Sequence, residues 1–197
     1  MDIIIPKVSK ISEDSISNMK KEADDLLIRL PIEESKEKVS KILLSEEFEK
    51  RVAFPHHWDR SLWEHLVKVG NKWVKYGNIL HLSNFAIENT AIAWISHDMY
   101  DEPWQDQIWK KPFFEQHWLV HAGIAADNMW EYFPELMNER IDDAIRKHMF
   151  PLSLPPKYLE SWLVWMADKS VSMEVVTDPK SIKDMLGFFK HGLKEKK

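Results

Sequence analysis

The sequence predicts an all-α protein, because glycine is scarce, apolar residues recur at helical spacing and prolines fall between the periodic segments. Only 5 of the 197 residues are glycine, whereas folds rich in tight turns usually need more. The 44% hydrophobic and 30% charged residues are typical of a globular chain with one substantial core. The 10 tryptophans are expected to pack mainly in that core.

Two helices are predicted in the first quarter of the chain. The first covers residues 12–30, where Ser12 or Asp14 can cap the amino end and a proline follows the carboxyl end. The second covers residues 32–48 and precedes a break at a Phe-Pro pair. The apolar residues expected to be buried are Leu26, Leu27 and Leu30 in the first helix, and Val39, Ile42, Leu43 and Leu44 in the second.

Two further helices are predicted in the middle of the chain. Residues 59–76 carry apolar side chains at helical spacing, and the Tyr76-Gly77-Asn78 segment is expected to stop this helix. Residues 84–97 include the very apolar run FAIENTAIAWIS, which is typical of a helix at the centre of a fold. Residues 99–112 contain prolines and polar side chains, and we expect a loop over the end of that helix.

Four helices are predicted in the remaining part of the chain. Residues 113–132 and 138–148 form two periodic segments that Pro134 separates. The proline-rich segment MFPLSLPP is expected to be a loop, and a helix over residues 157–176 follows it. An amphipathic helix over residues 181–193 leads into a basic tail.

Composition limits the classes of function. The formal net charge of −5 predicts no extended basic face, so nucleic-acid binding is not expected. Cysteine is absent, which leaves His, Asp and Glu as possible metal ligands. The amino-terminal segment lacks a signal-peptide pattern and no apolar run could span a bilayer, so we expect a cytoplasmic protein without membrane association. A homodimer is left open by the Trp- and Met-rich helices.

Ligand-type residues recur in consecutive predicted helices. His97 and Asp98 end the apolar helix, where a rigid element meets a polar loop, and their imidazole and carboxylate groups suit Zn, Mn, Fe, Co or Ni. Residues of the same kind lie in the neighbouring helices: His65 before it, and His121, His148 and Asp168 after it. Antiparallel helices of a bundle can bring such side chains to one centre. The pattern therefore predicts a metal site within the bundle.

Five segments resemble motifs of the HD-domain metal-dependent phosphohydrolases: SLWEHLVKVG, AIAWISHDMYDE, HWLVHAGIAADNM, IRKHMFPL and WMADKSVSMEV. The order and spacing of four residues are similar to the core metal set of that family, namely His65, His97, Asp98 and Asp168. His121 and His148 resemble the extra pair found in members that bind two metals. The sequence around HMFPL is similar to that of small stand-alone bacterial HD proteins.

This resemblance covers roughly residues 55–176 and implies a division of the chain. We expect an HD-domain helical bundle over residues 51–176, with a helical extension over residues 1–50 packed on its core. Residues 177–197 would add a C-terminal helix and a basic tail.

The resemblance also implies hydrolysis of a phosphate ester, either a nucleotide or a small phosphorylated metabolite, by metal-activated water. It implies one or two divalent transition metals per chain, from Fe, Mn, Co, Ni and Zn. Asp98 would bridge two ions, and Asp101 or its neighbour Glu102 would serve as a general acid or base where many HD proteins carry a lysine. Phosphate contacts are expected from Lys169 and Arg60, with Arg146 and Lys147 as further candidates.

Three other functions remain open. A di-iron oxygenase could use a similar His/Asp set, a non-catalytic binding module could keep the metal, and a nuclease is disfavoured by the net charge. His117 lies one helical turn before His121 and could face the same site. No site role is expected for the remaining histidines, which are His56, His57, His81 and His191. Trp104 and Trp109 are expected to pin the loop that contains them to the core.

Overall fold

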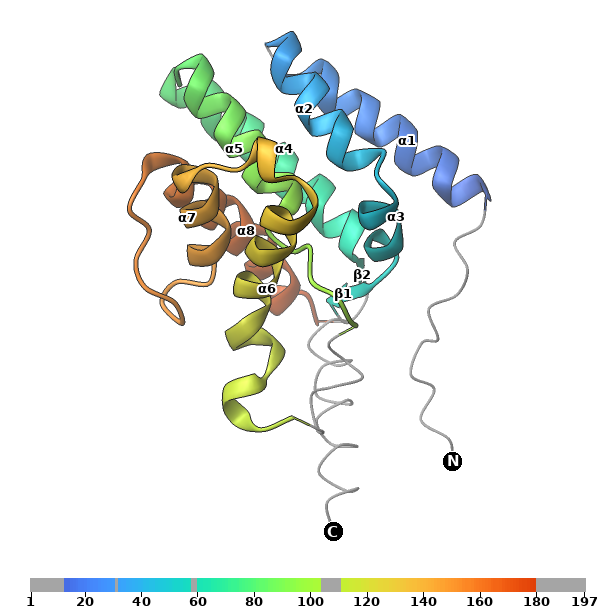
Figure 1. The fold of residues 1–197 in the computed structure, drawn as a ribbon. Coiled ribbons are helices and arrows are strands. Elements are labelled where there is room, and N and C mark those ends of the chain that lie inside the picture. Colours follow the sequence, from blue (N-terminus) through green and yellow to red (C-terminus); the bar gives the residue numbers. More distant parts are fainter. Residues whose placement is uncertain (1–12, 31, 58–59, 104–110, 180–197) are drawn as a thin grey trace.

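The computed structural model describes residues 13–30, 32–57, 60–103 and 111–179, and within them the protein is all-α apart from one short two-stranded ribbon (Figure 1). The predicted fold class is therefore confirmed. The α-helices are α1 (Glu13–Ile28), α2 (Glu33–Leu43), α3 (Glu46–Val52), α4 (Leu62–Leu80), α5 (Asn84–Ser96), α6 (His117–Tyr132), α7 (Glu139–Lys147) and α8 (Leu159–Thr177). The ribbon consists of β1 (Pro55–His57) and β2 (Arg60–Ser61), and short 3₁₀ helices cover Phe113–Glu115 and Pro134–Leu136.

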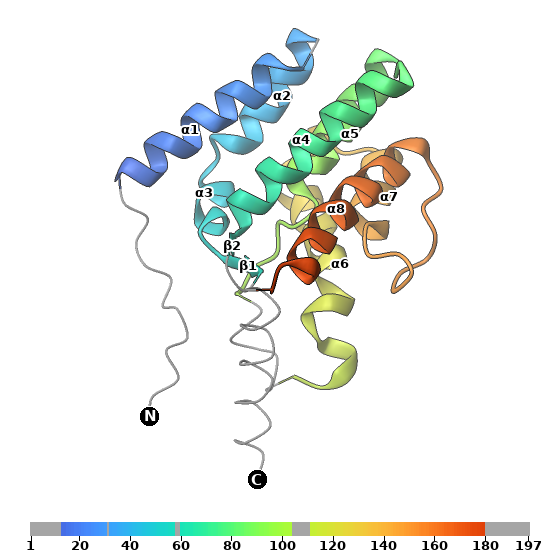
Figure 2. The same cartoon turned by 180° about the vertical axis from the view of Figure 1, so that it is seen from behind.

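The predicted central helix is α5, which is buried along most of its length. It packs against α2, α4, α7 and α8, while α1 lies against α2 and α4 (Figures 1 and 2). Side chains from these helices form one apolar core that includes Leu66, Trp94 and Ile145. The carboxyl end of α5 therefore opens into the middle of the molecule, where α4, α6, α7 and α8 surround it.

Two predicted helix boundaries are wrong. Residues 32–48 do not form one helix, because the Ser45 hydroxyl accepts a hydrogen bond from the Phe48 amide and starts α3 as a separate element. The helix predicted to stop at Tyr76-Gly77-Asn78 continues to Leu80 and ends at His81, which adopts a left-handed conformation with φ 48°. One glycine in a well-packed helix costs too little to end it.

The start of α4 was also predicted too early. Ser61 and Glu64 form a capping box, in which each side chain bonds the other residue's main-chain amide, and this fixes the first turn at Leu62. The preceding residues pair as the ribbon β1–β2, which the sequence did not predict. This ribbon places residues 55–57 beside the amino-terminal half of α4.

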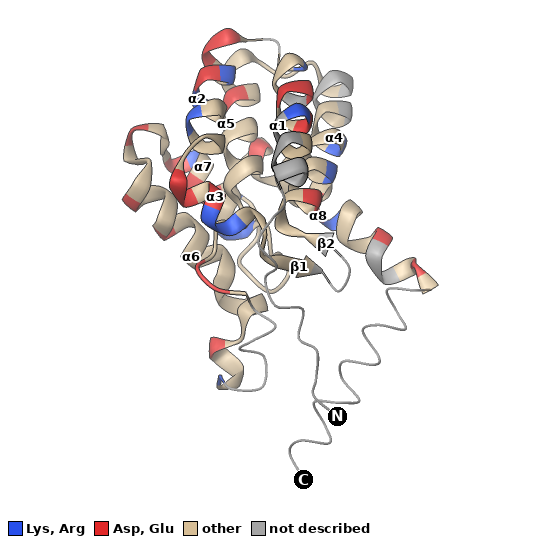
Figure 3. Ribbon diagram, turned by 90° about the vertical axis from the view of Figure 1, so that its right-hand side faces the viewer, with Lys and Arg blue, Asp and Glu red and all other residues tan. Residues whose placement is uncertain are grey.

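The surface carries mixed charge. In the view of Figure 3, Lys and Arg are interspersed with Asp and Glu on the helices rather than gathered in one stripe. None of the helices in the described segments is both long enough and apolar enough to cross a bilayer. The helix expected over residues 181–193 lies outside the described residues.

Candidate metal centre

Four histidines and two aspartates from five helices or their ends converge in the interior. His65 lies in α4, His97 caps α5 and Asp98 follows it, His121 lies in α6, His148 caps α7 and Asp168 lies in α8. All six side chains are buried: His65, His97, Asp98, His121, His148 and Asp168. Subsets of three offer ligand atoms within 4.8 Å of one another, as a metal site requires. The structure therefore brings together the six residues that the sequence singled out as metal ligands.

Asp98 lies between two groups of histidines. Its Oδ2 atom is 3.4 Å from Nε2 of His65 and 3.1 Å from Nε2 of His97. Its Oδ1 atom is 3.4 Å from Nε2 of His121 and 3.6 Å from Nε2 of His148. The two oxygens thus face different pairs of rings, which is the arrangement needed for a carboxylate that bridges two cations.

Asp168 belongs to the first of these groups. Its Oδ1 atom is 3.2 Å from Nε2 of His65 and 4.0 Å from Nε2 of His97. The two Nε2 atoms are themselves 3.3 Å apart. Three potential ligand atoms therefore surround one small volume, and Asp98 Oδ2 closes it.

Hydrogen bonds to the main chain orient three of the rings. Nδ1 of His97, His121 and His148 lies 2.7 Å from the carbonyl oxygens of Trp94, His117 and Ile145. A carbonyl oxygen only accepts, so each Nδ1 carries the proton and donates it. In a neutral ring the Nε2 lone pair then faces the cluster, which is the tautomer that a metal ligand needs.

With this tautomer, Nε2 lone pairs and a carboxylate oxygen face one another without a proton between them, and a bound cation would relieve this repulsion. Nε2 of His121 and Nε2 of His148 are 3.0 Å apart, although neither has a proton to share when both rings are neutral. Asp98 Oδ1, which lies near both, is buried and makes no hydrogen bond to the described residues. A buried carboxylate oxygen without a donor is costly, so the donor set fits a divalent cation at this position.

Burial and neighbouring charges set the protonation states. Burial lowers the pKa of His148 to about 3 and also lowers the pKa of His121, so both rings are neutral near pH 7. Burial also disfavours the charged form of His97, but the adjacent Asp98 carboxylate outweighs it and raises the pKa to about 9. Without a metal, His97 therefore keeps a proton next to Asp98, at a position where a cation would replace it.

Both carboxylates are ionised. Burial opposes their charge, but His97 and its neighbours hold the pKa of Asp98 well below its usual range. Lys169 is the largest influence that lowers the pKa of Asp168, again against burial. The cluster therefore combines imidazole nitrogens with anionic oxygens, a donor set suited to Zn, Mn, Fe, Co or Ni.

His56, for which no site role was expected, lies in the cluster. The ribbon turns β1 toward α4, so that Nε2 of His56 is 3.4 Å from Asp98 Oδ2 and its ring centroid is 4.0 Å from that of His65. Its Nδ1 atom is 3.3 Å from the hydroxyl of Tyr100, a buried residue of the loop after Asp98. The expectation that His56 has no site role is therefore wrong.

His117 also faces the cluster. Its ring stacks on His121 with centroids 4.5 Å apart and meets Tyr100 edge-to-face at the same distance. Burial, followed by the nearby His121, lowers its pKa to about 2, so the ring is neutral. Of the other histidines, His81 is exposed at the end of α4, the side chain of His57 is not described, and His191 lies outside the described residues.

A cavity of about 280 Å³ opens beside the ligand atoms of this cluster. Its walls include His117, Trp118, Met149, Lys169 and Ser172 in addition to His56 and four of the six buried residues. The Lys169 ammonium group donates to Asp168 Oδ2 over 2.7 Å and lies 3.2 Å from the sulfur of Met149. Lys169 is therefore the one Lys or Arg among the described residues that line this cavity.

Asp101 lies outside this cavity. Its Oδ1 atom accepts hydrogen bonds from Arg51 over 2.9 Å and from Asn128 over 2.7 Å. The same two side chains also bond the loop's main chain, Arg51 at the carbonyl of Tyr100 and Asn128 at the carbonyl of Met99. Asp101 thus fastens the loop that follows Asp98 to α3 and α6.

The other residues for which the sequence predicts a role are not among the described residues that line the cavity. Glu102 is exposed, with its carboxylate 3.9 Å from the Lys111 ammonium group. Arg146 is engaged with Asp142 and Asp127. The backbone of Arg60 lies in β2, but its side chain is not described, and Trp104 and Trp109 lie outside the described residues.

Comparisons with known proteins found no protein-family model, no curated protein and no solved structure that matches this chain. Function must therefore be argued from the buried His/Asp cluster, the cavity beside it and the sequence motifs that carry them.

Proposed function

We propose that this protein is a metal-dependent phosphohydrolase of the HD type, which hydrolyses the phosphate ester of a nucleotide or a small phosphorylated metabolite. One observation carries the proposal: the two oxygens of Asp98 face two different histidine pairs, His65 with His97 and His121 with His148. A shared carboxylate between two nitrogen-rich sets suits a two-metal centre for phosphoryl chemistry. The resemblance of the segments that carry these residues to HD-type motifs adds support.

The chain's residues divide between two ion positions. His65, His97, Asp98 and Asp168 would hold the first divalent ion, and His121 and His148 would hold a second together with Asp98. Fe, Mn, Co, Ni and Zn all suit these donors. When bound, such ions supply Lewis acidity toward a phosphoryl oxygen and lower the pKa of water.

The cavity provides the contacts for substrate. Lys169 is the one Lys or Arg among the described residues that line it, and its ammonium group has donors left beyond its bond to Asp168. It would hold a phosphate oxygen while Ser172, on the next turn of α8, offers a hydroxyl. His117 is neutral and Trp118 is apolar, so this wall would contact the organic part of the ester.

We assign Asp101 a positioning role within this function. Its carboxylate is occupied by Arg51 and Asn128, so it acts by fixing the loop between Asp98 and Tyr100 rather than by touching substrate. This loop sets the direction of the bridging carboxylate and of the Tyr100 hydroxyl beside His56. Support of this kind keeps a metal site in its working geometry.

Metal content and phosphatase activity test the proposal together. Untagged protein purified without chelator should carry one or two equivalents of a transition metal by elemental analysis. It should hydrolyse p-nitrophenyl phosphate or a nucleoside monophosphate when reconstituted with that metal. His97→Ala should abolish both properties, whereas His81→Asn, at an exposed left-handed position that Asn tolerates, should change neither.

Two outcomes would reject the phosphohydrolase. Full metal occupancy in His97→Ala would show that the cluster is not the metal site. Two bound irons with oxygen consumption and no phosphatase activity would establish a di-iron oxygenase on the same donor set.

A further inference from the structure

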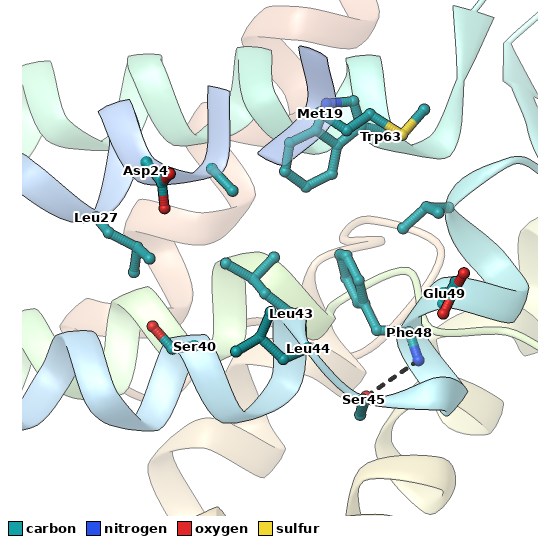
Figure 4. A pocket seen from close by; sticks show the side chains of 12 residues that line it. Met19, Asp24, Leu27, Ser40, Leu43, Leu44, Ser45, Phe48, Glu49 and Trp63 are labelled. Carbon is teal, nitrogen blue, oxygen red and sulfur yellow. Dashed lines mark hydrogen bonds between the residues drawn. The ribbon is translucent and has the colours of Figure 1, made fainter. Parts of the chain in front are cut away.

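A second cavity, away from the metal cluster, lies between α1 and the α2–α3 pair, where Trp63 of α4 also lines it (Figure 4). Its volume is about 390 Å³, and it shares none of its lining residues with the cavity beside the metal cluster. Met19 and Leu27 on α1 face Leu43 and Phe48 across the gap, and Trp63 of α4 stands beside Met19. Its walls are therefore mostly apolar and come from four helices.

The walls of this cavity are held in place from outside it. The indole nitrogen of Trp63 donates to the Glu22 carboxylate over 2.7 Å, and the ring meets Phe48 edge-to-face with centroids 6.2 Å apart. Ser45 caps α3 directly below the gap. The apolar surface is thus preformed, and leaving it in contact with water is unfavourable.

The size of the cavity selects its occupant. Pockets of roughly 300–1,000 Å³ hold small molecules, whereas a docked helix needs a long groove. Leu44 at the rim is 78% exposed, so the cavity communicates with solvent and a ligand can enter. A compact molecule with an apolar body matches these dimensions.

The charge around the cavity selects the polar end of that molecule. Two carboxylates lie among the lining residues, Asp24 on α1 and Glu49 on α3, and no Lys or Arg lines it within the described part of the chain (Figure 4). Two cations of α3, Lys50 and Arg51, are engaged outside the cavity, since both pair with Glu47. Two carboxylates beside an apolar cavity repel an anionic ligand and attract a cationic one.

We propose that this cavity is a binding site for a small amphipathic cation, a molecule with a compact apolar body and one amine or ammonium group. The apolar body lies between α1 and α2 against Trp63 and Phe48. Asp24, beside Leu27, and Glu49, beside Phe48, lie at opposite ends of the gap (Figure 4), and the ammonium group stays at the rim beside one of these two carboxylates. This site is independent of the metal centre, and its test does not require phosphatase activity.

Calorimetric titration of the full chain at pH 7 with three probes of equal chain length tests the site. Octylamine, octanol and octanoate share an apolar body and differ in charge. Octylamine should bind most tightly, and octanoate about tenfold more weakly, because attraction becomes repulsion at two screened carboxylates. The paired substitutions Asp24→Asn and Glu49→Gln should remove this preference while octanol binding remains.

Matched tryptophan variants on α1 locate the bound probe. Ala23→Trp fills the cavity and should abolish octylamine binding, whereas Asn18→Trp, on the exposed side of the same helix, should leave it unchanged. Equal binding in both variants would mean non-specific adsorption and would overturn the proposal. So would equal affinity for all three probes, or a dimer in sedimentation that Ala23→Trp dissociates, since a second copy would then be the occupant.

Discussion

Nε2 of His121 and Nε2 of His148 face each other at 3.0 Å, while the Nδ1 atom of each ring is fixed 2.7 Å from a main-chain carbonyl. The carbonyl bonds prevent either ring from turning its protonated nitrogen inward without losing a buried hydrogen bond. The pair therefore remains strained by facing lone pairs until a cation accepts both. A metal ion bound here would therefore also stabilise this part of the fold.

The first prediction concerns the number of ions. His148→Ala removes one nitrogen of the His121–His148 pair but leaves His65, His97 and Asp168 in place. Titration with Mn or Zn, followed by elemental analysis after dialysis, should show loss of the weaker equivalent and retention of the tighter one. Unchanged stoichiometry in His148→Ala would rule out a second ion at Asp98 Oδ1.

The second prediction concerns the pH dependence of the metal-free protein. Below pH 6.5 the histidines of the unfolded chain become protonated, whereas His117 and His148 stay neutral in the folded protein, where their pKa values are about 2 and about 3. Stability should therefore fall as the pH drops from 6.5 toward 3. Above pH 6.5 the folded chain keeps a proton on His97, whose pKa is about 9, so stability should also fall as the pH rises to 9.

Urea unfolding in the presence of a chelator, over a series of pH values, measures this curve. Its maximum should lie near pH 6.5, the ordinary pKa of histidine. Metal-loaded protein should lose the decline between pH 6.5 and 9, because the ion replaces the proton on His97. A metal-free curve that is flat over that range would contradict the charge assigned to His97.

The extent to which the sequence predicts this molecule depends on how local each signal is. The helices and the six buried ligand-type residues could be predicted, since apolar periodicity and Ser or Asn caps are encoded within a few residues. The break between α2 and α3 could not, because Leu43 and Leu44 continue the apolar pattern across it and only the Ser45 cap marks it. Boundaries of this kind are decided by one hydrogen bond.

Residues whose contacts near the site the sequence does not predict are brought there by packing between distant segments of the chain. His56 reaches Asp98 because a ribbon of five residues folds beside α4, and nothing in the sequence around His56 shows that pairing. The contact that Asp101 makes could not be predicted for the same reason, since its partner Arg51 lies 50 residues earlier. Sequence spacing predicts which residue types occur near the site, whereas long-range packing decides which of them touch it.

The third prediction tests that long-range clamp. Arg51→Met removes the buried guanidinium that binds the Tyr100 carbonyl, the Glu47 carbonyl and Asp101, and should destabilise the protein by about 2 kcal/mol. It should also weaken metal binding, because the loop that carries Asp98 loses its anchor. Lys50→Met on the exposed side of α3 is the control and should affect neither thermal unfolding nor metal affinity. Destabilisation without loss of metal affinity would reduce Arg51 to a purely structural residue.

The fourth prediction concerns phosphate recognition. Lys169→Met should weaken competitive inhibition by inorganic phosphate about tenfold, because the charged donor at the cavity is lost. Lys147→Met is the matched control, since Lys147 adjoins His148 in sequence but does not line the cavity. Metal content should be measured for both variants, because Lys169 also bonds Asp168. Equal inhibition of Lys169→Met and the parent protein would remove Lys169 from the substrate site.

The fifth prediction compares two glycines in the helices that support the site. A Cβ atom at Gly70 would overlap the indole ring of Trp94. The indole nitrogen donates to the Leu66 carbonyl, and the main-chain carbonyl of Trp94 accepts from Nδ1 of His97. Gly70→Ala should therefore cost about 3 kcal/mol through overpacking. At Gly123 the nearest atom to such a Cβ is 3.9 Å away, so Gly123→Ala should stabilise α6 by about 0.5–1 kcal/mol.

Thermal unfolding of the metal-free variants separates these two effects. Gly70→Ala should lower the midpoint by about 6–12 °C, at roughly 2–4 °C per kcal/mol for a chain of this size, while Gly123→Ala raises it slightly. Because Trp94 orients His97, Gly70→Ala should also weaken metal binding, and Gly123→Ala should not. A neutral Gly70→Ala would show that α4 and α5 do not approach as closely as the contact between Gly70 and Trp94 requires.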